Sequence, residues 1–262
     1  MSTYLITGAA SGIGAKCAEY FAERGHSVIG LDVKPIGNSA IRSFVADITA
    51  AESLEEIKSA LLEEGVKLDG IISVAGVHAM ASFVETEFSS IERLMNINLL
   101  GTMRVNSTFH SLLAERGRII IITSEVATYD PMPFNGLYNV SKTALECYAQ
   151  ALRQELNLIG QRVITVRPGS TETELARGSA TATAALAEST VLYRTQAKHF
   201  SEIVRKFTGT PISPEALARL VYKAATVKHP RLAYAKHRNA GLVLLNLLPK
   251  RLQCAIIKSI LK

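Results

Sequence analysis

The run Tyr4-Leu5-Ile6-Thr7-Gly8-Ala9-Ala10-Ser11-Gly12-Ile13-Gly14 passes from a strand-like stretch through a glycine-rich turn into a helix-like one. Its three glycines allow a tight turn, a close approach of the backbone to a ligand, and close packing of the helix on a sheet. The helix would offer unpaired N–H groups and the positive end of its dipole to phosphates. An ordinary turn is the alternative, but the strand before it and the helix after it favour nucleotide binding.

Short β-branched runs alternate with longer helical patterns along the chain. We expect strands at residues 4–7, 27–32, 42–46, 68–75, 118–124 and 162–167, and helices near 12–24, 50–64, 88–115 and 138–159. The four isoleucines at 119–122 suit a strand that is covered on both faces. The alternation predicts an α/β fold, a doubly wound parallel sheet (Rossmann fold), in one domain over residues 1–262. Ligands of such sheets bind at the carboxyl ends of the strands.

Composition narrows the class of protein. A chain of 262 residues, 48% hydrophobic with a net charge of +6, can bury a large core and is not disordered. The cysteines Cys17, Cys147 and Cys254 are too few and too far apart for a disulfide framework, so we expect a cytoplasmic protein. Cys147 is expected in the core. The sequence predicts no signal peptide, no membrane span, no metal site and no nucleic-acid partner.

Charge is divided unevenly along the chain. All 23 acidic residues lie at or before Glu215, whereas the 47 residues after it carry ten cations and no acid. We expect residues 236–262 to form a basic, apolar helical extension at the C-terminus. Three roles remain open for it: packing on the body or on a subunit partner, peripheral contact with an anionic membrane, or attraction of an anionic substrate or acidic carrier.

Acidic residues follow the second and third predicted strands. Asp32 lies 18 residues after Gly14, where a carboxylate can accept hydrogen bonds from ribose hydroxyls and repels a 2′-phosphate. We therefore expect NAD rather than NADP, although Lys34 could favour the phosphate unless it is a solvated loop residue. Asp47 is placed to meet the edge of the adenine; its alternative role is to cap the helix at 50–64.

Tyr138 and Lys142 open the long helix after the fifth strand, and their spacing of four puts both on one helix face. A free tyrosine has a pKa of about 10. A neighbouring ammonium and a positively charged nicotinamide would stabilise the phenolate, so that the tyrosine could act as a general acid and base. Ser124, at the end of the fifth strand, could hydrogen-bond a carbonyl oxygen on which charge develops.

Further motifs follow these in the order found in one family. They are Asp47-Ile48, Asn98 within 95–101, and Pro168-Gly169 with Thr173 after the sixth strand. With the glycine-rich turn and the Ser–Tyr–Lys set, they make the chain resemble the short-chain dehydrogenase/reductase family over residues 3–235. Among its members, the chain is most similar in overall look to hydroxysteroid and retinol dehydrogenases.

The resemblance implies a catalytic tetrad of Asn98, Ser124, Tyr138 and Lys142. Tyr138 would exchange a proton with the substrate oxygen, which Ser124 would position. Lys142 would hold the nicotinamide ribose and lower the pKa of the tyrosine, and Asn98 would anchor a water that relays protons to Lys142.

The cofactor contacts expected from the motifs and the resemblance lie at the strand ends. Thr173 and the backbone near Pro168 would fix the carboxamide, and Ala75-Gly76 would allow a close approach. The full set is Gly8, Ser11, Gly12, Ile13, Gly14, Asp32, Asp47, Ile48, Ala75, Gly76, Tyr138, Lys142, Pro168, Gly169 and Thr173. The resemblance also implies homodimers or homotetramers, formed through the helices near 88–115 and 138–159.

The chain departs from the family's pattern at two places. The usual Asn-Asn-Ala-Gly reads Ser73-Val74-Ala75-Gly76, so a side-chain tie between neighbouring strands is expected to be lost. Ser124 lies 14 residues before Tyr138, one more than the family leads us to expect. The loop 125–137 is therefore expected to bulge, with Thr123 as the alternative to Ser124.

The segment 174–212 is expected to form a helical substrate lid with an apolar inner face that includes Val191, Leu192, Tyr193, Phe200, Ile203, Val204 and Phe207. Phe134 and Leu137 would add an apolar wall beside Tyr138. We therefore expect an NAD-linked oxidoreductase of a hydrophobic secondary alcohol or its ketone, with a steroid-, retinoid- or lipid-like substrate. The alternatives are a 3-oxoacyl-thioester reductase and a nucleotide-sensing protein without turnover.

Overall fold

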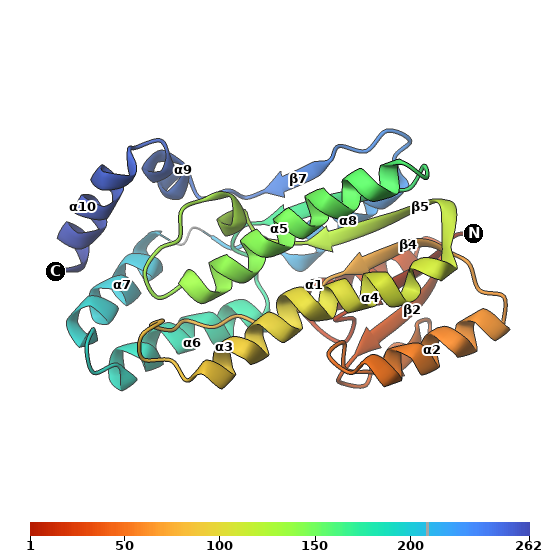
Figure 1. Cartoon of the computed structure of the whole chain (residues 1–262), viewed down its shortest axis with the longest axis horizontal. Coiled ribbons are helices and arrows are strands. Elements are labelled where there is room, and N and C mark those ends of the chain that lie inside the picture. The colour runs from red at the N-terminus through yellow and green to blue at the C-terminus, as the bar shows by residue number, and fades with distance from the viewer. Residues whose placement is uncertain (208–209) are drawn as a thin grey trace.

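A seven-stranded parallel sheet, in the order β3-β2-β1-β4-β5-β6-β7, forms the centre of the computed structural model (Figure 1). The structure describes residues 1–207 and 210–262, without the side chains of 174–180 and 207. The strands are β1 (Thr3–Thr7), β2 (Ser27–Asp32), β3 (Arg42–Val45), β4 (Leu68–Ser73), β5 (Leu113–Ile122), β6 (Arg162–Pro168) and β7 (Ala233–Lys236). The predicted doubly wound α/β fold is confirmed.

Helices follow most of the strands. They are α1 (Gly12–Ala22), α2 (Ala51–Glu63), α3 (Phe88–Met95), α4 (Thr102–Phe109), α5 (Gly136–Asn157), α6 (Glu174–Ser189), α7 (Arg194–Phe207), α8 (Pro214–Thr226), α9 (Ala240–Asn246) and α10 (Lys250–Leu261). A π-helical turn, η1 (Asn96–Gly101), joins α3 to α4, and the short 3₁₀ turns η2 (His110–Leu112) and η3 (Glu125–Thr128) flank β5.

Alternation along each strand divides the core between the two faces of the sheet. Ile119 and Ile121 pack with residues of α2, α4 and α5, whereas Ile120 and Ile122 pack with residues of α1 and α8. This explains why the run at 119–122 is apolar at every position: a central parallel strand has no solvated face.

The structure differs from the expected elements at β5 and β7. The sequence pattern predicts a helix through residue 115, but β5 begins at Leu113, which pairs with Leu68 of β4. β7 was not expected; it forms because Ala233 to Lys236 pair in parallel with the outer edge of β6. Both elements depend on a distant partner strand, and the local sequence pattern does not record that partner.

Predictions for individual side chains also need correction. Cys147 is exposed on α5, and the prediction that it lies in the core was wrong. Val191 and Leu192 are exposed between α6 and α7, so they do not face inward as expected. Tyr193, Phe200, Ile203 and Val204 do join an apolar cluster, together with Phe134, Leu186 and Leu261. The side chain of Phe207 lies outside the described residues.

The C-terminal extension forms the helices α9 and α10 at one end of the molecule, where α10 packs beside α7 (Figure 1). Among the described residues, no helix is long and apolar enough to cross a membrane.

Candidate active site

The glycine-rich turn joins β1 to α1 at the carboxyl edge of the sheet. Gly8 and Gly12 have φ angles of 70° and 54°, which favour glycine. A Cβ atom on Gly14 would lie 2.0 Å from the carbonyl oxygen of Gly8, so the turn closes only with glycine there. Ser11 is the N-cap of α1, and its side chain makes no capping hydrogen bond. The first-turn N–H groups around Ile13 therefore have no intrahelical or capping partner, as an anion site requires.

Asp32 lies directly beside this turn. Its Oδ2 accepts a hydrogen bond from the Ala10 amide at 2.9 Å, and its Oδ1 accepts one from the Lys34 amide at 2.9 Å. A carboxylate has about four acceptor positions, so both oxygens can still accept bonds from hydroxyl groups. The structure thus brings the predicted ribose-binding residue to the predicted phosphate-binding turn.

The side chains of Asp47 and Ile48, which follow β3, both contact other residues of the chain. Asp47 Oδ1 accepts hydrogen bonds from the amide and the hydroxyl of Thr49, both at 2.8 Å. This bond closes a turn ahead of α2, whose N-cap is Ala50, so Asp47 does not cap that helix itself. Ile48 is buried against Gly101. Its side chain is therefore part of the core.

Asn98 connects the fourth strand's loop to α5. Its Oδ1 accepts from the Val77 amide at 2.7 Å, and its Nδ2 donates to the Val77 carbonyl at 2.9 Å and to Ser141 Oγ at 3.0 Å. It lies in the π-helical turn η1, a type of distortion that is frequent at functional sites. A Cβ atom on Gly76 would lie 3.1 Å from Asn98 Oδ1 and 3.5 Å from Lys142 Nζ. Gly76, Asn98 and Lys142 are therefore next to one another.

The expected loss of a strand tie is compensated. Thr7 Oγ1 accepts hydrogen bonds from the amides of Val74 and Ala75, at 3.0 and 3.1 Å, and so connects β1 to the end of β4. Ser73 Oγ donates to Asn106 Oδ1 of α4 at 3.0 Å. The backbone at Ala75 is thereby held beside Gly8.

Ser124, Tyr138 and Lys142 come together where β5 ends and α5 begins. The Ser124 hydroxyl lies close enough to that of Tyr138 to lower its pKa. Lys142 Nζ donates to the Ile122 carbonyl at 3.2 Å and lies 5.8 Å from the centre of the Tyr138 ring. Thr123, the alternative to Ser124, is engaged elsewhere: its hydroxyl donates to Glu146 at 2.6 Å.

Burial controls the titration of this pair. It raises the pKa of Tyr138 to about 12, although the nearby Ser124 hydroxyl opposes the shift. It lowers the pKa of Lys142 to about 8. Loss of hydration is therefore the largest influence on the Tyr138 pKa in the chain without cofactor.

His78 is a neighbour of Tyr138 that the sequence did not reveal. Its ring centre lies 4.4 Å from that of Tyr138, and its Nε2 is 3.0 Å from Asn135 Oδ1. Its Nδ1 is buried without a hydrogen-bond partner among the described residues. Burial lowers the pKa of His78, which favours the neutral ring. The only signal in the sequence was its place two residues after Gly76.

Pro168, Gly169 and Thr173 complete this edge of the sheet. The Gly169 amide donates to the Lys236 carbonyl of β7 at 2.9 Å. Thr173 returns to the glycine-rich turn, where its Cγ2 lies 3.4 Å from the position of a Cβ on Gly12. The two ends of the predicted cofactor site, after β1 and after β6, are therefore adjacent.

The loop between Ser124 and Tyr138 has an irregular backbone. It begins with the 3₁₀ turn η3, and Phe134 adopts a φ of 65°, in the left-handed region that large side chains rarely enter. Phe134 and Leu137 are both buried, and Phe134 packs in the apolar cluster with Phe200 and Leu261.

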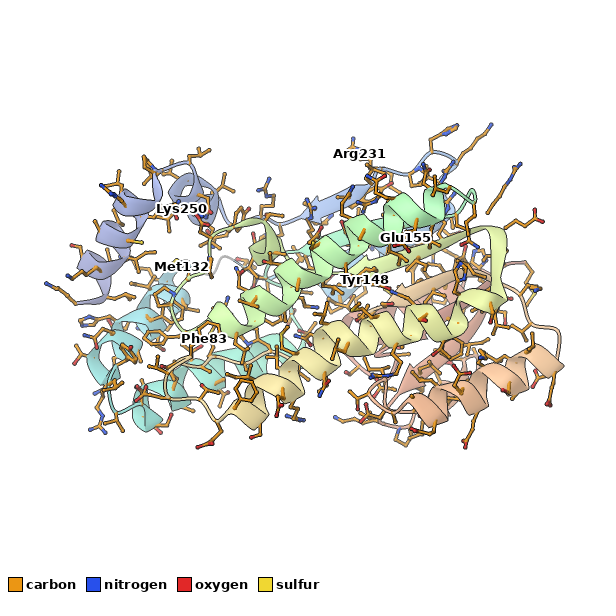
Figure 2. The ribbon with its side chains drawn as sticks, in the orientation of Figure 1. Phe83, Met132, Tyr148, Glu155, Arg231 and Lys250 are labelled. Carbon is orange, nitrogen blue, oxygen red and sulfur yellow. The ribbon has the colours of Figure 1, made fainter. Side chains whose placement is uncertain are left out.

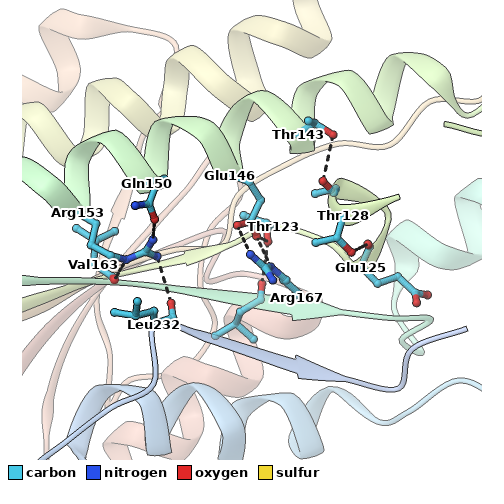
Figure 3. Close-up of polar contacts among 12 residues, drawn as sticks. Thr123, Glu125, Thr128, Thr143, Glu146, Gln150, Arg153, Val163, Arg167 and Leu232 are labelled. Atoms are coloured by element: carbon cyan, nitrogen blue, oxygen red, sulfur yellow. Dashed lines mark hydrogen bonds and ion pairs between the residues drawn. The ribbon is translucent and has the colours of Figure 1, made fainter. Parts of the chain in front are cut away.

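An ion pair between Glu146 and Arg167 ties α5 to the sheet (Figure 3). Both carboxylate oxygens of Glu146 accept from the Arg167 guanidinium, at 2.8 and 2.7 Å. Since Thr123 also donates to Glu146, the helix that carries Tyr138 is tied to both β5 and β6.

The residues present fit a dinucleotide. Free N–H groups lie at the start of α1, Asp32 offers acceptors beside them, and the glycine at 76 leaves space next to Lys142 that a side chain would fill. Within the part of the chain that the structure describes, no cluster of three His, Cys, Asp or Glu residues could hold a metal ion.

Comparisons with known proteins show the family to which the chain is similar. Residues 2–184 match the family model described as short chain dehydrogenase. The chain is 31% identical over 185 residues to 1-hydroxy-2-glutathionyl-2-methyl-3-butene dehydrogenase of Rhodococcus sp. (strain AD45), covering 68% of this chain and 81% of the relative. It is 31% identical over 172 residues to 3-ketodihydrosphingosine reductase of Bacteroides thetaiotaomicron, covering 64% of each. The structure of a short chain dehydrogenase family protein from Francisella tularensis superposes with a TM-score of 0.76 at 22% identity, covering 90% of this chain and 96% of the other.

Proposed function

This chain belongs to the short-chain dehydrogenase/reductase family, and on that premise we propose that it interconverts a hydrophobic secondary alcohol and its ketone with NAD(H). Members of the family are oxidoreductases that act on alcohols or ketones with NAD(P)(H). The observation that carries the proposal is the meeting of Ser124, Tyr138 and Lys142 beside the dinucleotide-binding turn.

When bound, the dinucleotide supplies or accepts the hydride. The Tyr138 hydroxyl donates a proton to the carbonyl oxygen during reduction and accepts it from the alcohol during oxidation. The Ser124 hydroxyl, which lies beside that of Tyr138, holds that oxygen at the point where negative charge develops. A pKa of about 12 keeps Tyr138 protonated in the chain alone, so it is ready to act as an acid.

Lys142 and Asn98 support this proton transfer. A lysine with a pKa of about 8 is charged at neutral pH but can release its proton at little cost. It lies between Gly76 and Tyr138, where it can bind a ribose hydroxyl and stabilise a phenolate. In the chain alone, the Asn98 carboxamide is bonded to Val77 and Ser141, so we propose that it orders the loop and α5 around Lys142.

The apolar cluster next to the site supports a hydrophobic substrate. Phe134 comes from the loop before Tyr138, and it packs with Phe200 of α7 and with the partly buried Met80 and Met132. The relative from Bacteroides is named 3-ketodihydrosphingosine reductase. We propose a lipid-like ketone or alcohol as the substrate class, with steroids and retinoids as the other members to test, and α6–α7 as the lid.

Tyr138→Phe tests the reaction. Because it removes only the hydroxyl that moves the proton, we expect kcat to fall roughly 100- to 10,000-fold while NADH still binds, as measured by its fluorescence. Tyr148→Phe, on the same helix (Figure 2), is the matched control and should keep its activity. A Tyr138→Phe enzyme with full activity would remove the basis of the proposal. A screen that finds turnover only with 3-oxoacyl thioesters would assign the alternative reductase.

Asp32 determines the cofactor in this proposal. Its charge lies beside the Ala10 amide and repels a 2′-phosphate, so NADH should bind more tightly than NADPH in a titration of the unmodified chain. Asp32→Asn keeps an acceptor oxygen but removes the charge. It should reduce the preference for NADH over NADPH roughly tenfold. Tighter binding of NADPH by the parent would reverse the assignment.

A further inference from the structure

The helices α9 and α10 expose apolar side chains at one end of the molecule. α9 has the sequence AGLVLLN, yet none of its residues is buried, and Leu244 is 65% exposed. Leu247, just after α9, is 76% exposed, and Leu252 and Ile260 of α10 are exposed as well. These side chains lie on two helices that contact each other, and exposed apolar surface can mark a contact site.

Cations accompany these side chains. The exposed cations are Lys250, Arg251, Lys258 and Lys262, and no acidic residue follows Glu215 in the sequence. Lys250 has an ion-pair partner, Asp130, at 3.1 Å. In the described ranges, the other three cations lie within salt-bridge distance of no carboxylate.

Charge argues against a second copy of the chain as the occupant of this surface. In a two-fold contact with a second copy of the chain, the same surface meets itself, so these cations would face the cations of the partner. An anionic lipid surface has the opposite charge, and each nearby Lys or Arg strengthens binding to it roughly fivefold. Apolar side chains among cations also fit the boundary between headgroups and acyl chains.

We propose that α9 and α10 form a docking surface for an anionic lipid bilayer. The residues of this docking surface are Leu244, Leu247, Leu252 and Ile260, which enter the headgroup layer, and Lys250, Arg251, Lys258 and Lys262, which bind lipid phosphates. The contact is peripheral.

Hydrogen bonds connect the docking surface to the candidate active site. The Asp130 amide donates to Asn246 Oδ1 of α9 at 2.6 Å, and Gln253 Nε2 of α10 donates to Asp130 Oδ2 at 3.2 Å. Asp130 belongs to the loop between Ser124 and Tyr138.

Two more bonds reach the same loop from the residues just before α9. The Asn239 amide donates to Glu125 at 2.6 Å, and Arg238 Nε donates to the Tyr129 hydroxyl at 2.8 Å. The C-terminal helices and the residues before them therefore contact the loop that carries the apolar wall. A bilayer bound to these helices would lie at the end of the molecule where a lipid-like substrate would enter. This last consequence rests on the proposed function, whereas the docking does not.

Co-sedimentation with vesicles tests the docking without turnover. The full chain should pellet with vesicles of phosphatidylcholine and phosphatidylglycerol, remain in solution with phosphatidylcholine alone, and be released by added salt. We expect Arg251→Glu/Lys258→Glu and Leu244→Glu/Leu247→Glu to reduce the partition coefficient roughly tenfold or more. Arg116→Glu/Leu158→Glu is the matched control, since it adds the same kind of charge to exposed residues outside the extension.

Each outcome has one meaning. A parent chain that stays in solution with both kinds of vesicle, or a control variant that loses binding equally, overturns the docking. A smaller mass of Leu244→Glu/Leu247→Glu in light scattering, with no vesicle binding by the parent, would assign the surface to a second copy of the chain. Reduction of a water-soluble ketone, measured in the same samples without vesicles, reports separately on the proposed function.

Discussion

At the residue scale, Lys142 is a buried charged residue that is only 4% exposed. Burial lowers its pKa from 10.5 to about 8, because the charged form loses more hydration than the Ile122 carbonyl replaces. Between these two pH values the unfolded chain binds more protons than the folded chain. The free energy of unfolding therefore rises with pH across this window.

Lys142→Met makes this effect measurable. Relative to the variant, the parent should gain about 3 kcal/mol in free energy of unfolding from pH 7 to 10.5, as measured by urea denaturation. The contributions of other titrating groups cancel in this comparison, because both proteins contain those groups. Lys223→Met, at an exposed lysine of α8, is the control and should show little of this gain. A difference between parent and Lys142→Met that stays constant with pH would contradict the assigned burial.

At the scale of elements, the position of α5 relative to the sheet decides whether Tyr138 meets Ser124. The Glu146–Arg167 pair holds α5 to β6, and Thr123 holds it to β5 (Figure 3). Burial raises the pKa of Glu146, but the bonds from Arg167 and Thr123 outweigh it and lower the pKa below the usual value. The carboxylate thus stabilises the fold above that usual value, and the stabilisation is lost as the pH falls through the lowered one.

Glu146→Gln should reduce the free energy of unfolding by about 2 kcal/mol at neutral pH, because it leaves the Arg167 charge partly buried without its partner. The difference from the parent should shrink in acid, where the parent's carboxylate is protonated. Glu155→Gln, on the exposed side of the same helix (Figure 2), should cost little. An equal loss in both variants would show that the helix, rather than the ion pair, is responsible.

At the scale of the whole molecule, the family resemblance implies a homodimer or homotetramer, and we propose a two-fold contact through the face formed by α3, η1, α4 and α5. This face exposes Phe88, Leu100, Met103 and Val140. Apolar side chains from four neighbouring elements make a surface suited to a two-fold contact.

Leu100→Glu/Met103→Glu should convert the dimer to a monomer, because it places four carboxylates at the two-fold contact. Light scattering coupled to size-exclusion chromatography measures the mass directly. Leu158→Glu, at an exposed leucine beyond the end of α5, should leave the mass unchanged. A monomeric parent, or a variant with the parent's mass, would exclude this face.

The sequence by itself determined the features that depend on near neighbours in the chain. Gly8, Gly12 and Gly14 predict the turn because positive φ angles and close contacts demand glycine there. The spacing of Tyr138 and Lys142 places them on one helix face, and the apolar run at 119–122 predicts a strand covered on both sides. These regularities are local, so a single sequence contains them.

Tertiary structure alone decided what depends on residues far apart in the chain. β7 exists because β6 offers it an edge, and His78 lies against Tyr138 because the loop after β4 returns to α5. The raised pKa of Tyr138 in the chain without cofactor likewise depends on burial by several surrounding elements. The connection between the C-terminal helices and the loop before Tyr138 likewise needs folded partners more than 100 residues apart, as in Asp130 and Asn246.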